Sequence, residues 1–512
     1  MQALLGIDLG TTGVKAALFA ADDGRVLADA FFEYPLYHPH PGWAEQNPAE
    51  WWQATVSAIC ACLNAAKQHD VQPADVRGVG LSGQMHGVVL LDERQNVLRP
   101  CIIWADQRSE AQCRWMTERV GAEKLIEYVS NPALTGFSTP KLLWIRDNEP
   151  EIFARARTML LPKDYIRYLL TGVMAMEISD AAGTCLLDVK RGAWSQEVIQ
   201  ALELDPALLP PVVPADAMSG KITLEVAAQT GLAVDTPVAG GGADNACGAV
   251  GNGIVAPGLA LLSVGTSGIV LAYSDEPKVD TSGPVPRVHT FNHAVPHAWY
   301  LMGVTQGAGL LLRWVRDNIG LPERALERWT SMDAYEFLAL EAANVAPGSD
   351  GLIFLPYLQG ERTPHLDANA RGGWIGLTAS RDRRHLVRSV LEGVAFSLKD
   401  CFAIISEQGL RIDQLRATGG GARSLLWRQI IADVLGTELV LTNASEGPAF
   451  GAALIAGVAS GVYPSLREAC ERTVHVTQRT VPNGETAPAY ARAYETYRAL
   501  YPALKPVISR AE

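Results

Sequence analysis

Apolar runs of strand length alternate with helical patterns along most of the chain. Strand-like runs occupy residues 3–7, 79–81 and 415–418, and apolar residues at helical spacing mark 386–397 and 424–432. Asn47-Pro48 followed by Glu50 is typical of a helix start, and the predicted apolar face of that helix holds Trp52, Val56, Ile59, Cys60 and Leu63. Strands that alternate with helices predict an α/β fold.

The first strand-like run is followed by a turn sequence and a second apolar run. Gly10-Thr11-Thr12-Gly13 separates residues 3–7 from residues 14–19, which predicts a β-hairpin. The same arrangement returns at residues 259–273, around Gly265-Thr266-Ser267-Gly268. Two such units about half a chain apart indicate duplicated lobes. We expect one lobe at residues 1–250 and the other at 251–512.

The composition excludes several classes of protein. The chain has 512 residues, 48% of them hydrophobic and 19% charged, so it is globular rather than disordered. Its net charge of −12 is spread without a basic stripe, which argues against a nucleic-acid partner. Eight scattered cysteines are too few for a disulfide scaffold. An aspartate at position 8 and the lack of a long apolar run predict a cytoplasmic protein with no membrane partner.

The first hairpin carries groups that suit a phosphate chain. Glycines at a tight turn expose backbone N–H groups, Thr11 and Thr12 add hydroxyls, and Asp8 is set back where it would hold magnesium through water. The alternative is a plain hairpin turn in which Asp8 accepts turn hydrogen bonds. The second copy at Gly265-Thr266 favours phosphate binding, because two facing hairpins grip a phosphate chain from both sides.

A glycine-rich segment, AGGGADNA at residues 239–246, precedes a predicted helix. Three glycines allow a ligand to approach the backbone closely, and Asp244 stands at the head of the helix. Asp244 is therefore either an N-cap residue or a general base that takes a proton from a substrate hydroxyl during phosphoryl transfer.

A second glycine-rich turn, Gly419-Gly420-Gly421, joins a strand to a helix. Such a unit suits a nucleoside or its α-phosphate, although a turn that binds nothing is an equal alternative. Ser424 breaks the dinucleotide-binding fingerprint, and the sequence has no Walker A motif. Dehydrogenases and P-loop enzymes are therefore disfavoured.

Polar residues also follow the strand at 79–81, in the stretch SGQMHG at residues 82–87. Side chains at a strand end are placed to contact a small polar ligand, although a lone histidine such as His86 is more often structural. The ten histidines show no zinc-ligand spacing, so no zinc site is expected.

Two longer segments resemble the signatures of the FGGY family of carbohydrate kinases. They are GFSTPKLLWIRDN at residues 136–148 and GGWIGL at 372–377, the latter followed by His385-Leu386 and SVLE at 389–392. The resemblance extends from Leu5 to about residue 460. It implies a two-lobed actin-like ATPase (ribonuclease H-like) sugar kinase fold, with duplicated lobes and a central cleft.

The resemblance also implies roles for individual residues. Asp244 matches the family's catalytic carboxylate, and Asp8 matches the acidic residue near magnesium and the γ-phosphate. Met85 and His86 match the pair that contacts the sugar, and Trp104 and Asn245 line the same pocket. The positions that match the nucleotide site are Thr11, Thr12, Gly265 and Thr266 of the two hairpins, and Gly420 and Gly421 of the adenosine turn. Ala243 is an extra residue between the glycines and Asp244, so the resemblance leaves the roles of Gly240, Gly241 and Gly242 open.

The stretches GQMHG (residues 83–87), LLPKDYIRYLLTG (160–172) and SDAAGT (179–184) are most similar to family members that act on D-xylulose. We therefore expect ATP-dependent phosphorylation of D-xylulose at its 5-hydroxyl, with Mg²⁺. The expected partners are the sugar and ATP, together with a second copy of the chain in a homodimer. The alternatives are a kinase for ribulose, gluconate, fuculose or glycerol, and an actin-fold ATPase that phosphorylates no sugar.

Overall fold

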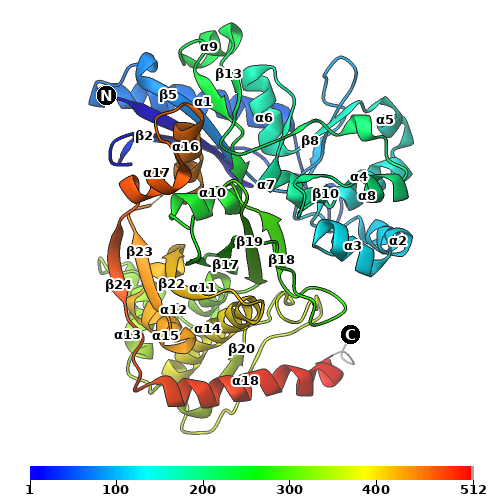
Figure 1. Ribbon diagram of the computed structural model, residues 1–512. Coiled ribbons are helices and arrows are strands. Elements are labelled where there is room, and N and C mark those ends of the chain that lie inside the picture. The colour runs from blue at the N-terminus through cyan, green and yellow to red at the C-terminus, as the bar shows by residue number, and fades with distance from the viewer. Residues whose placement is uncertain (445, 509–512) are drawn as a thin grey trace.

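The computed structural model describes residues 1–444 and 446–508 and has two lobes, each built on a seven-stranded sheet (Figure 1). The first sheet runs in the order β13 (Met218–Lys221), β14 (Pro237–Ala239), β5 (Val76–Gly83), β1 (Ala3–Leu9), β2 (Gly13–Ala20) and β3 (Val26–Glu33), and β15 (Gly242–Ala243) also pairs with β5. The second runs in the order β18 (His289–Asn292), β19 (Trp299–Thr305), β17 (Gly268–Ser274), β16 (Gly258–Val264), β22 (Ile412–Thr418), β23 (Glu438–Thr442) and β24 (Val476–Thr480). The α/β prediction is confirmed.

Both sheets repeat one arrangement at their centres. An antiparallel hairpin, β1–β2 in the first and β16–β17 in the second, is flanked by a parallel strand next to its first member, β5 or β22. Each hairpin has the predicted Gly-Thr-containing turn between its strands, so the predicted duplication is confirmed. The division of the chain at residue 250 stays a prediction.

The first long helix, α1 (Pro48–Ala66), starts where the sequence indicated. The Asn47 side chain accepts a hydrogen bond from the Ala49 N–H. The predicted apolar face is only partly right. Ile59 and Leu63 are buried against β2 and β3 as predicted, but the buried face turns toward Trp51 and Cys62, and Cys60 is exposed. The buried stripe also contains Ala54 and Ala58, and small residues carry too little apolar signal to be counted in a hydrophobic pattern.

Two helices, α10 (Asp244–Gly251) and α16 (Gly447–Ala459), lie side by side, and α16 packs on a face of the first sheet (Figure 1). Glycine lets their backbones touch: a Cβ on Gly451 would lie 1.8 Å from the Cys247 carbonyl oxygen. The other side of α16 packs on β1 and β5, where a Cβ on Gly6 would lie 1.8 Å from the Ala449 oxygen. Although α16 comes late in the chain, it packs against the sheet formed by the first 250 residues.

Two helices, α14 (Arg383–Glu407) and α15 (Leu425–Leu435), pack on the second sheet, and α18 (Ala487–Ile508) packs on these two helices. Ser424 caps α15 by accepting a hydrogen bond from the Trp427 N–H. Buried tyrosines of α18, among them Tyr490 and Tyr497, pack around Phe396 of α14.

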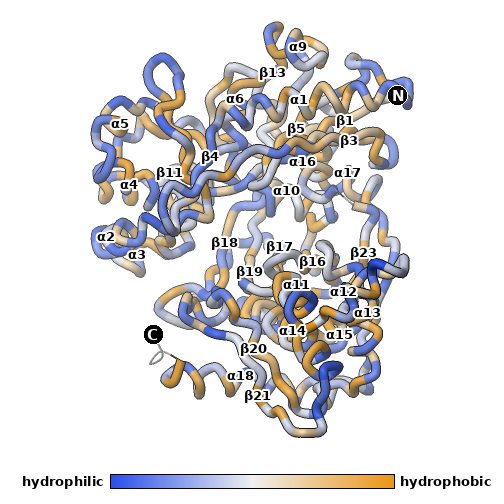
Figure 2. The backbone as a smooth tube through the Cα atoms, turned by 180° about the vertical axis from the view of Figure 1, so that it is seen from behind, coloured by the Kyte–Doolittle hydropathy of each residue, from blue (hydrophilic) through white to orange (hydrophobic). Residues whose placement is uncertain are grey.

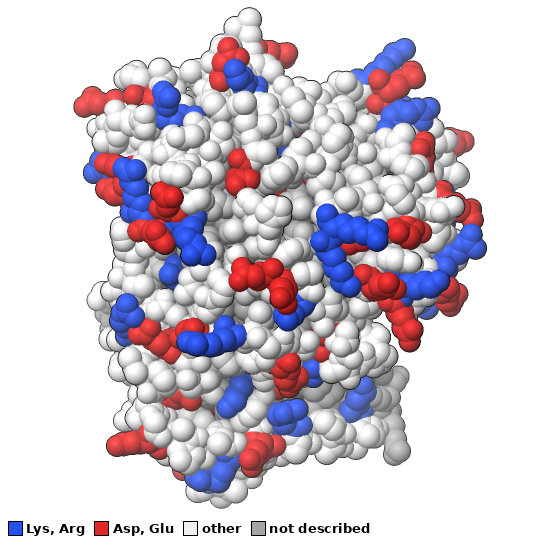
Figure 3. Space-filling model, in the orientation of Figure 1, with Lys and Arg blue, Asp and Glu red and all other residues white. Residues whose placement is uncertain are grey.

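Hydrophobic and hydrophilic residues interleave along the helices of both lobes (Figure 2). Among the described residues, no helix combines the length and the apolar character needed to cross a membrane. On the face drawn in Figure 3, basic and acidic side chains are interspersed rather than gathered by sign.

The remaining elements form the outer part of the first lobe and the connections of the second. Their strands are β4 (Glu45–Gln46), β6 (Val89–Leu91), β7 (Cys101–Ile102), β8 (Thr158–Leu160), β9 (Met176–Glu177), β10 (Leu187–Asp188), β11 (Ala193–Trp194), β12 (Val212–Val213), β20 (Ile353–Leu355) and β21 (Gly373–Ile375). Their helices are α2 (Glu110–Val120), α3 (Ala122–Val129), α4 (Ser138–Asn148), α5 (Pro150–Arg155), α6 (Pro162–Thr171), α7 (Ile178–Ala181), α8 (Gln196–Ala201), α9 (Leu224–Thr230), α11 (Gly309–Asn318), α12 (Leu321–Glu327), α13 (Ala334–Ala342) and α17 (Leu466–Thr473).

Candidate active site

Strand pairing brings Asp8 and the start of α10 to the same edge of the first sheet. Asp8 on β1 is paired with Ser82 on β5, and Ser82 is paired with Gly242 on β15, two residues before Asp244. The Ser82 hydroxyl donates a hydrogen bond to Asp8 Oδ1 at 2.8 Å. Burial is the main reason that the pKa of Asp8 is raised, although the Ser82 hydrogen bond lowers it.

Asp244 is the first residue of α10 and does not cap it. The N-cap position belongs to Ala243, so the capping alternative is wrong. Asp244 Oδ1 accepts hydrogen bonds from the Asn245 backbone N–H at 2.7 Å and from Asn245 Nδ2 at 3.0 Å, and within the described chain Oδ2 accepts none. Burial, together with the nearby charge of Asp8, raises the pKa of Asp244 to about 7. A partly buried carboxylate with one free oxygen and this pKa is suited to accept a proton near neutral pH.

The predicted sugar-contacting residues lie beside Asp244. Asn245 Nδ2 is 3.8 Å from the Met85 sulfur, so Met85, Asn245 and Asp244 form a continuous group. His86 follows Met85 with a left-handed backbone, φ 73°. Its Nδ1 lies 2.8 Å from the Gly183 carbonyl oxygen, and burial lowers the pKa of the imidazole to about 3. A carbonyl only accepts, so neutral His86 donates from Nδ1 and keeps Nε2 as an acceptor.

Aromatic side chains surround the His86 ring. Phe137, from the segment at residues 136–148, lies edge-on at 4.8 Å between ring centroids, and Phe291 of β18 lies at 6.3 Å. Lys141 of α4 is fully buried and donates to the carbonyl oxygens of Phe137 at 2.9 Å and His86 at 3.4 Å. The lysine thereby ties α4 to the backbone of the candidate sugar pocket.

Trp104 contacts the first hairpin. Its indole Nε1 donates to the Thr11 hydroxyl at 2.9 Å, and 39% of the residue is exposed. Gln46 and Gln84 fix the same turn, since Gln46 Nε2 donates to the Thr11 oxygen at 2.6 Å and Gln84 Nε2 donates to the Gly10 oxygen at 3.3 Å. Gln84 belongs to the polar stretch at residues 82–87, whereas Gln46 was not predicted, because it shares no local sequence pattern with the hairpin it holds.

In the second lobe, the other hairpin and the predicted adenosine turn are packed together. Gly419 has the left-handed φ of 89°. A Cβ added to Gly421 would lie 2.4 Å from the side chain of Val264, the last residue of β16. The hairpin turn is fixed by Gly309 N–H, which donates to the Gly265 oxygen at 2.7 Å, and by Ala308 N–H, which donates to the Thr266 oxygen at 3.0 Å. Nothing lies within 4 Å of the position a Cβ would take on Gly420.

Each of the three glycines before Asp244 makes a different close contact that leaves no room for a side chain. A Cβ on Gly240 would lie 2.3 Å from the Pro214 oxygen. Gly241 has φ 82°, and its Cβ would lie 2.3 Å from the Leu81 oxygen. Gly242 packs on Cys247, whose sulfur would lie 2.9 Å from a Cβ. All three permit close packing of this turn against neighbouring backbone and side chains.

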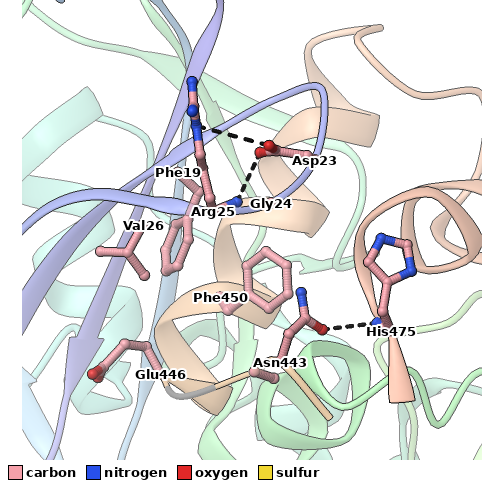
Figure 4. Close-up of a pocket in the computed structure, with 10 residues that line it drawn as sticks. Phe19, Asp23, Gly24, Arg25, Val26, Asn443, Glu446, Phe450 and His475 are labelled. Carbon is pink, nitrogen blue, oxygen red and sulfur yellow. Dashed lines mark hydrogen bonds and ion pairs between the residues drawn. The ribbon is translucent and has the colours of Figure 1, made fainter. Parts of the chain in front are cut away.

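A 410 Å³ pocket lies away from these residues (Figure 4). It is bounded by the β2–β3 turn and by the segments around Asn443 and His475. Two pairs of its polar groups are hydrogen-bonded to each other: Arg25 N–H donates to Asp23 Oδ1 at 3.0 Å, and His475 N–H donates to Asn443 Oδ1 at 2.8 Å. None of the predicted site residues lines it.

Comparison with known proteins assigns the chain to a family. Residues 3–251 match the N-terminal domain, and residues 260–460 the C-terminal domain, of the FGGY family of carbohydrate kinases. A protein of Bacillus subtilis named xylulose kinase is 39% identical over 98% of this chain and 97% of its own length. One of Escherichia coli with the same name is 40% identical over 99% of this chain and 100% of its own.

The solved structures agree with the curated relatives. The crystal structure of xylulose kinase from Rhodospirillum rubrum superposes with a TM-score of 0.90 at 32% identity, over 99% of this chain and 100% of that one. This likeness confirms the expected sugar kinase fold, and the family matches exclude an actin-fold ATPase without kinase activity. The two lobes, with their paired hairpins, are those of an ATP-dependent sugar kinase, and the chain belongs to the FGGY family of carbohydrate kinases.

Proposed function

We propose that this kinase phosphorylates D-xylulose at its 5-hydroxyl, with ATP as the phosphoryl donor and Mg²⁺ as its metal ion. The observation that carries the proposal is the carboxylate of Asp244, which is partly buried beside Met85 and Asn245, has a pKa of about 7 and keeps one oxygen free of hydrogen bonds from the described chain. Relatives named xylulose kinase, 39% and 40% identical over nearly the whole chain, support the choice of sugar.

Asp244 acts as the general base in this proposal. Its free Oδ2 accepts the proton of the 5-hydroxyl as the oxygen attacks the γ-phosphorus and the bond to ADP breaks. The hydrogen bonds from Asn245 to Oδ1 orient the carboxylate, which is how a positioned base lowers the barrier. The neutral His86 offers Nε2 to a sugar hydroxyl, and Met85 and Trp104 complete the wall of the pocket.

The two hairpins hold the triphosphate. Thr11 and Thr12 contribute from the first lobe, Gly265 and Thr266 from the second, and Gly420 and Gly421 lie against the adenosine. Asp8 fits a magnesium ion, because it is a hard oxygen donor at the foot of the first hairpin, and Mg²⁺ is commonly held by one or two carboxylates together with substrate phosphates. When bound, the ion neutralises charge on the terminal phosphates.

The choice of sugar is tested with a panel of D-xylulose, D-ribulose, L-fuculose, D-gluconate and glycerol, followed by ADP release. A neutral His86 suits a neutral ketose, and we expect D-xylulose to have the highest kcat/KM. Arg362 lies close enough to His86 for its charge to lower the pKa of that ring, so the anionic D-gluconate is the most informative competitor. A higher kcat/KM for any other member of the panel overturns the choice of D-xylulose.

The role of Asp244 is tested with Asp244→Asn, which keeps the size of the side chain and removes its basicity. We expect kcat to fall by about 10²- to 10⁴-fold, while D-xylulose binding measured by titration calorimetry is retained. Asp216→Asn is the matched control, because Asp216 is also a partly buried carboxylate with a raised pKa. A near-normal kcat for Asp244→Asn contradicts the mechanism.

A homodimer stays a prediction from the sequence, and light scattering of the purified protein measures it directly.

A further inference from the structure

Beneath the glycine turn that leads to Asp244 lies a group of five fully buried ionisable side chains, which we call the charged cluster: Lys163, Asp164 and Arg167 of α6, Glu177 of β9 and Asp180 of α7. Lys163 Nζ is 2.8 Å from Asp164, 3.8 Å from Glu177 and 3.7 Å from Asp180. Arg167 is 3.1 Å from Asp164. The cluster contains none of the predicted sugar or nucleotide contacts.

Two side chains connect this region to the glycine turn. Arg167 Nη1 donates to the Gly240 carbonyl oxygen at 3.2 Å, at the start of the turn. At its end, the Ala243 N–H donates to the Ser179 hydroxyl oxygen at 3.0 Å. Ala243 is the residue immediately before Asp244, so Ser179 fixes the last peptide group before the proposed base.

Ser179 is itself held in one orientation by Glu177. The Ser179 hydroxyl donates its only hydrogen to Glu177 Oε2 at 2.7 Å, and the Ser179 backbone N–H donates to Glu177 Oε1 at 2.8 Å. Because the hydroxyl hydrogen is committed to Glu177, the lone pairs of the oxygen face the Ala243 N–H. A chain of hydrogen bonds therefore runs from Glu177 through Ser179 to the residue that precedes Asp244.

Burial of this many charges is poorly explained by stability. Neither carboxylate oxygen of Asp180 accepts a hydrogen bond within the described chain. Well-packed apolar residues of similar volume commonly stabilise a protein as much as a buried ion pair or more. Polar groups do what apolar residues cannot: they fix the direction of individual peptide groups, such as the carbonyl of Gly240 and the amide of Ala243.

We propose that Ser179, oriented by Glu177, is a positioning residue that sets the direction in which the Asp244 carboxylate enters the candidate sugar pocket. The inference rests on the proposed role of Asp244 as general base. Ser179 contacts neither substrate in this scheme and acts only through the peptide group of Ala243.

The test is Ser179→Ala, which removes the acceptor for the Ala243 N–H. We expect kcat to fall by about 10- to 100-fold, because small displacements of a catalytic group have effects of this size. The KM values for D-xylulose and ATP should stay within about twofold, since an interaction made only in the transition state is lost. Ser195→Ala is the control: Ser195 is equally buried and also accepts a backbone hydrogen bond, from Val198 N–H at the start of α8, but has no contact with the glycine turn.

Equal kcat values for Ser179→Ala and Ser195→Ala overturn the inference, whether both values are normal or both are reduced. If Ser179→Ala does not fold, Glu177→Gln carries the same test, because its single amide oxygen can accept only one of the two hydrogens that Ser179 donates to Glu177. An unchanged kcat in that variant also overturns the inference. Should Asp244→Asn be inactive and Ser179→Ala fully active, only the positioning role fails. If Asp244→Asn is active, the proposed function fails first.

Discussion

At the scale of single residues, the pKa of Asp244 connects structure to pH dependence. Burial and the charge of Asp8 raise it to about 7, so the carboxylate holds a proton below that pH. We expect kcat for D-xylulose phosphorylation to fall as the pH drops below about 7. In Asp8→Asn the neighbouring negative charge is gone, so the residual activity should show the same fall at a lower pH. Profiles of kcat against pH for both proteins measure the shift. If kcat falls at the same pH in both, the charge of Asp8 does not affect the pKa of Asp244.

The same pKa predicts a penalty in stability. The folded-state pKa of about 7 lies above the ordinary value of 3.8 for an aspartate, so between these two pH values the folded protein holds a proton that the unfolded chain has released. The free energy of unfolding therefore decreases as the pH rises from about 3.8 to about 7, and the whole loss of stability is present above pH 7. Asp244→Asn removes it and should stabilise the protein by on the order of a few kcal/mol at high pH.

Urea unfolding of the wild-type protein and Asp244→Asn, compared at pH 8 and at a pH near 5, measures this penalty. The difference between the two proteins should be larger at pH 8. A difference that does not change with pH would show that Asp244 titrates normally.

Lys141 gives a prediction for the sugar pocket. It ties the carbonyl oxygens of Phe137 and His86 together, and burial lowers its pKa to about 7. Lys141→Met keeps the length of the side chain but removes these hydrogen bonds, so His86 loses its fixed position. We expect a KM for D-xylulose raised by about tenfold, the effect of roughly 1.4 kcal/mol, with little change in the KM for ATP. Lys124→Met, at an exposed position, is the control, and equal effects on both substrates would contradict a role confined to the sugar pocket.

At the scale of elements, α16 decides how Asp8 and Asp244 lie relative to one another. It touches β1, which carries Asp8, through Gly6, and it touches α10, which carries Asp244, through Gly451. Both contacts are between backbones, so neither strand nor helix can move without the other. The catalytic geometry thus depends on a helix that contributes no side chain to the proposed chemistry.

Gly451→Ala tests this dependence. Its new Cβ would lie 1.8 Å from the Cys247 oxygen, so α10 has to shift. We expect a loss of about 1 to 3 kcal/mol in the free energy of unfolding, typical of overpacking, together with a reduced kcat. Gly484→Ala serves as the control because nothing lies within 4 Å of its added Cβ. Unfolding curves and kcat values of the two variants test this expectation. A stable and fully active Gly451→Ala would show that the close contact between α16 and α10 is not needed.

Elements defined by neighbouring residues were predictable from the sequence, and those defined by distant contacts were not. Both hairpins and the start of α1 follow from turn and capping residues within a few positions of each other. The apolar face of α1 was only partly predicted, because Ala54 and Ala58 acquire their burial only from the sheet. The hydrogen bond between Ser179 and Ala243 joins residues more than sixty positions apart, so no local sequence pattern predicts it.

At the scale of the whole molecule, the lobes meet at the wall of the candidate sugar pocket. β18 belongs to the second sheet, yet it is hydrogen-bonded to the outer part of the first lobe. Asn131 Nδ2 donates to the Thr290 oxygen at 2.7 Å, and Asn292 Nδ2 donates to the Val189 oxygen at 3.0 Å. β18 also supplies Phe291, which packs near His86. The pocket that is proposed to hold the sugar is therefore built by both lobes.

This shared wall predicts that sugar and nucleotide binding are coupled. A ligand that draws on both lobes favours their closed arrangement, and linkage requires each ligand to tighten the other by the same factor, about 5- to 150-fold in typical cases. Asn131→Ala removes the bond to Thr290 and leaves the catalytic residues intact. We expect the coupling factor to shrink in that variant, whereas Asn344→Ala, which removes a hydrogen bond to the Leu340 oxygen within one lobe, leaves it unchanged. Titration calorimetry of D-xylulose with and without a non-hydrolysable ATP analogue gives the factor directly. If Asn131→Ala retains the wild-type factor, the lobes communicate through α10 and α16 rather than through β18.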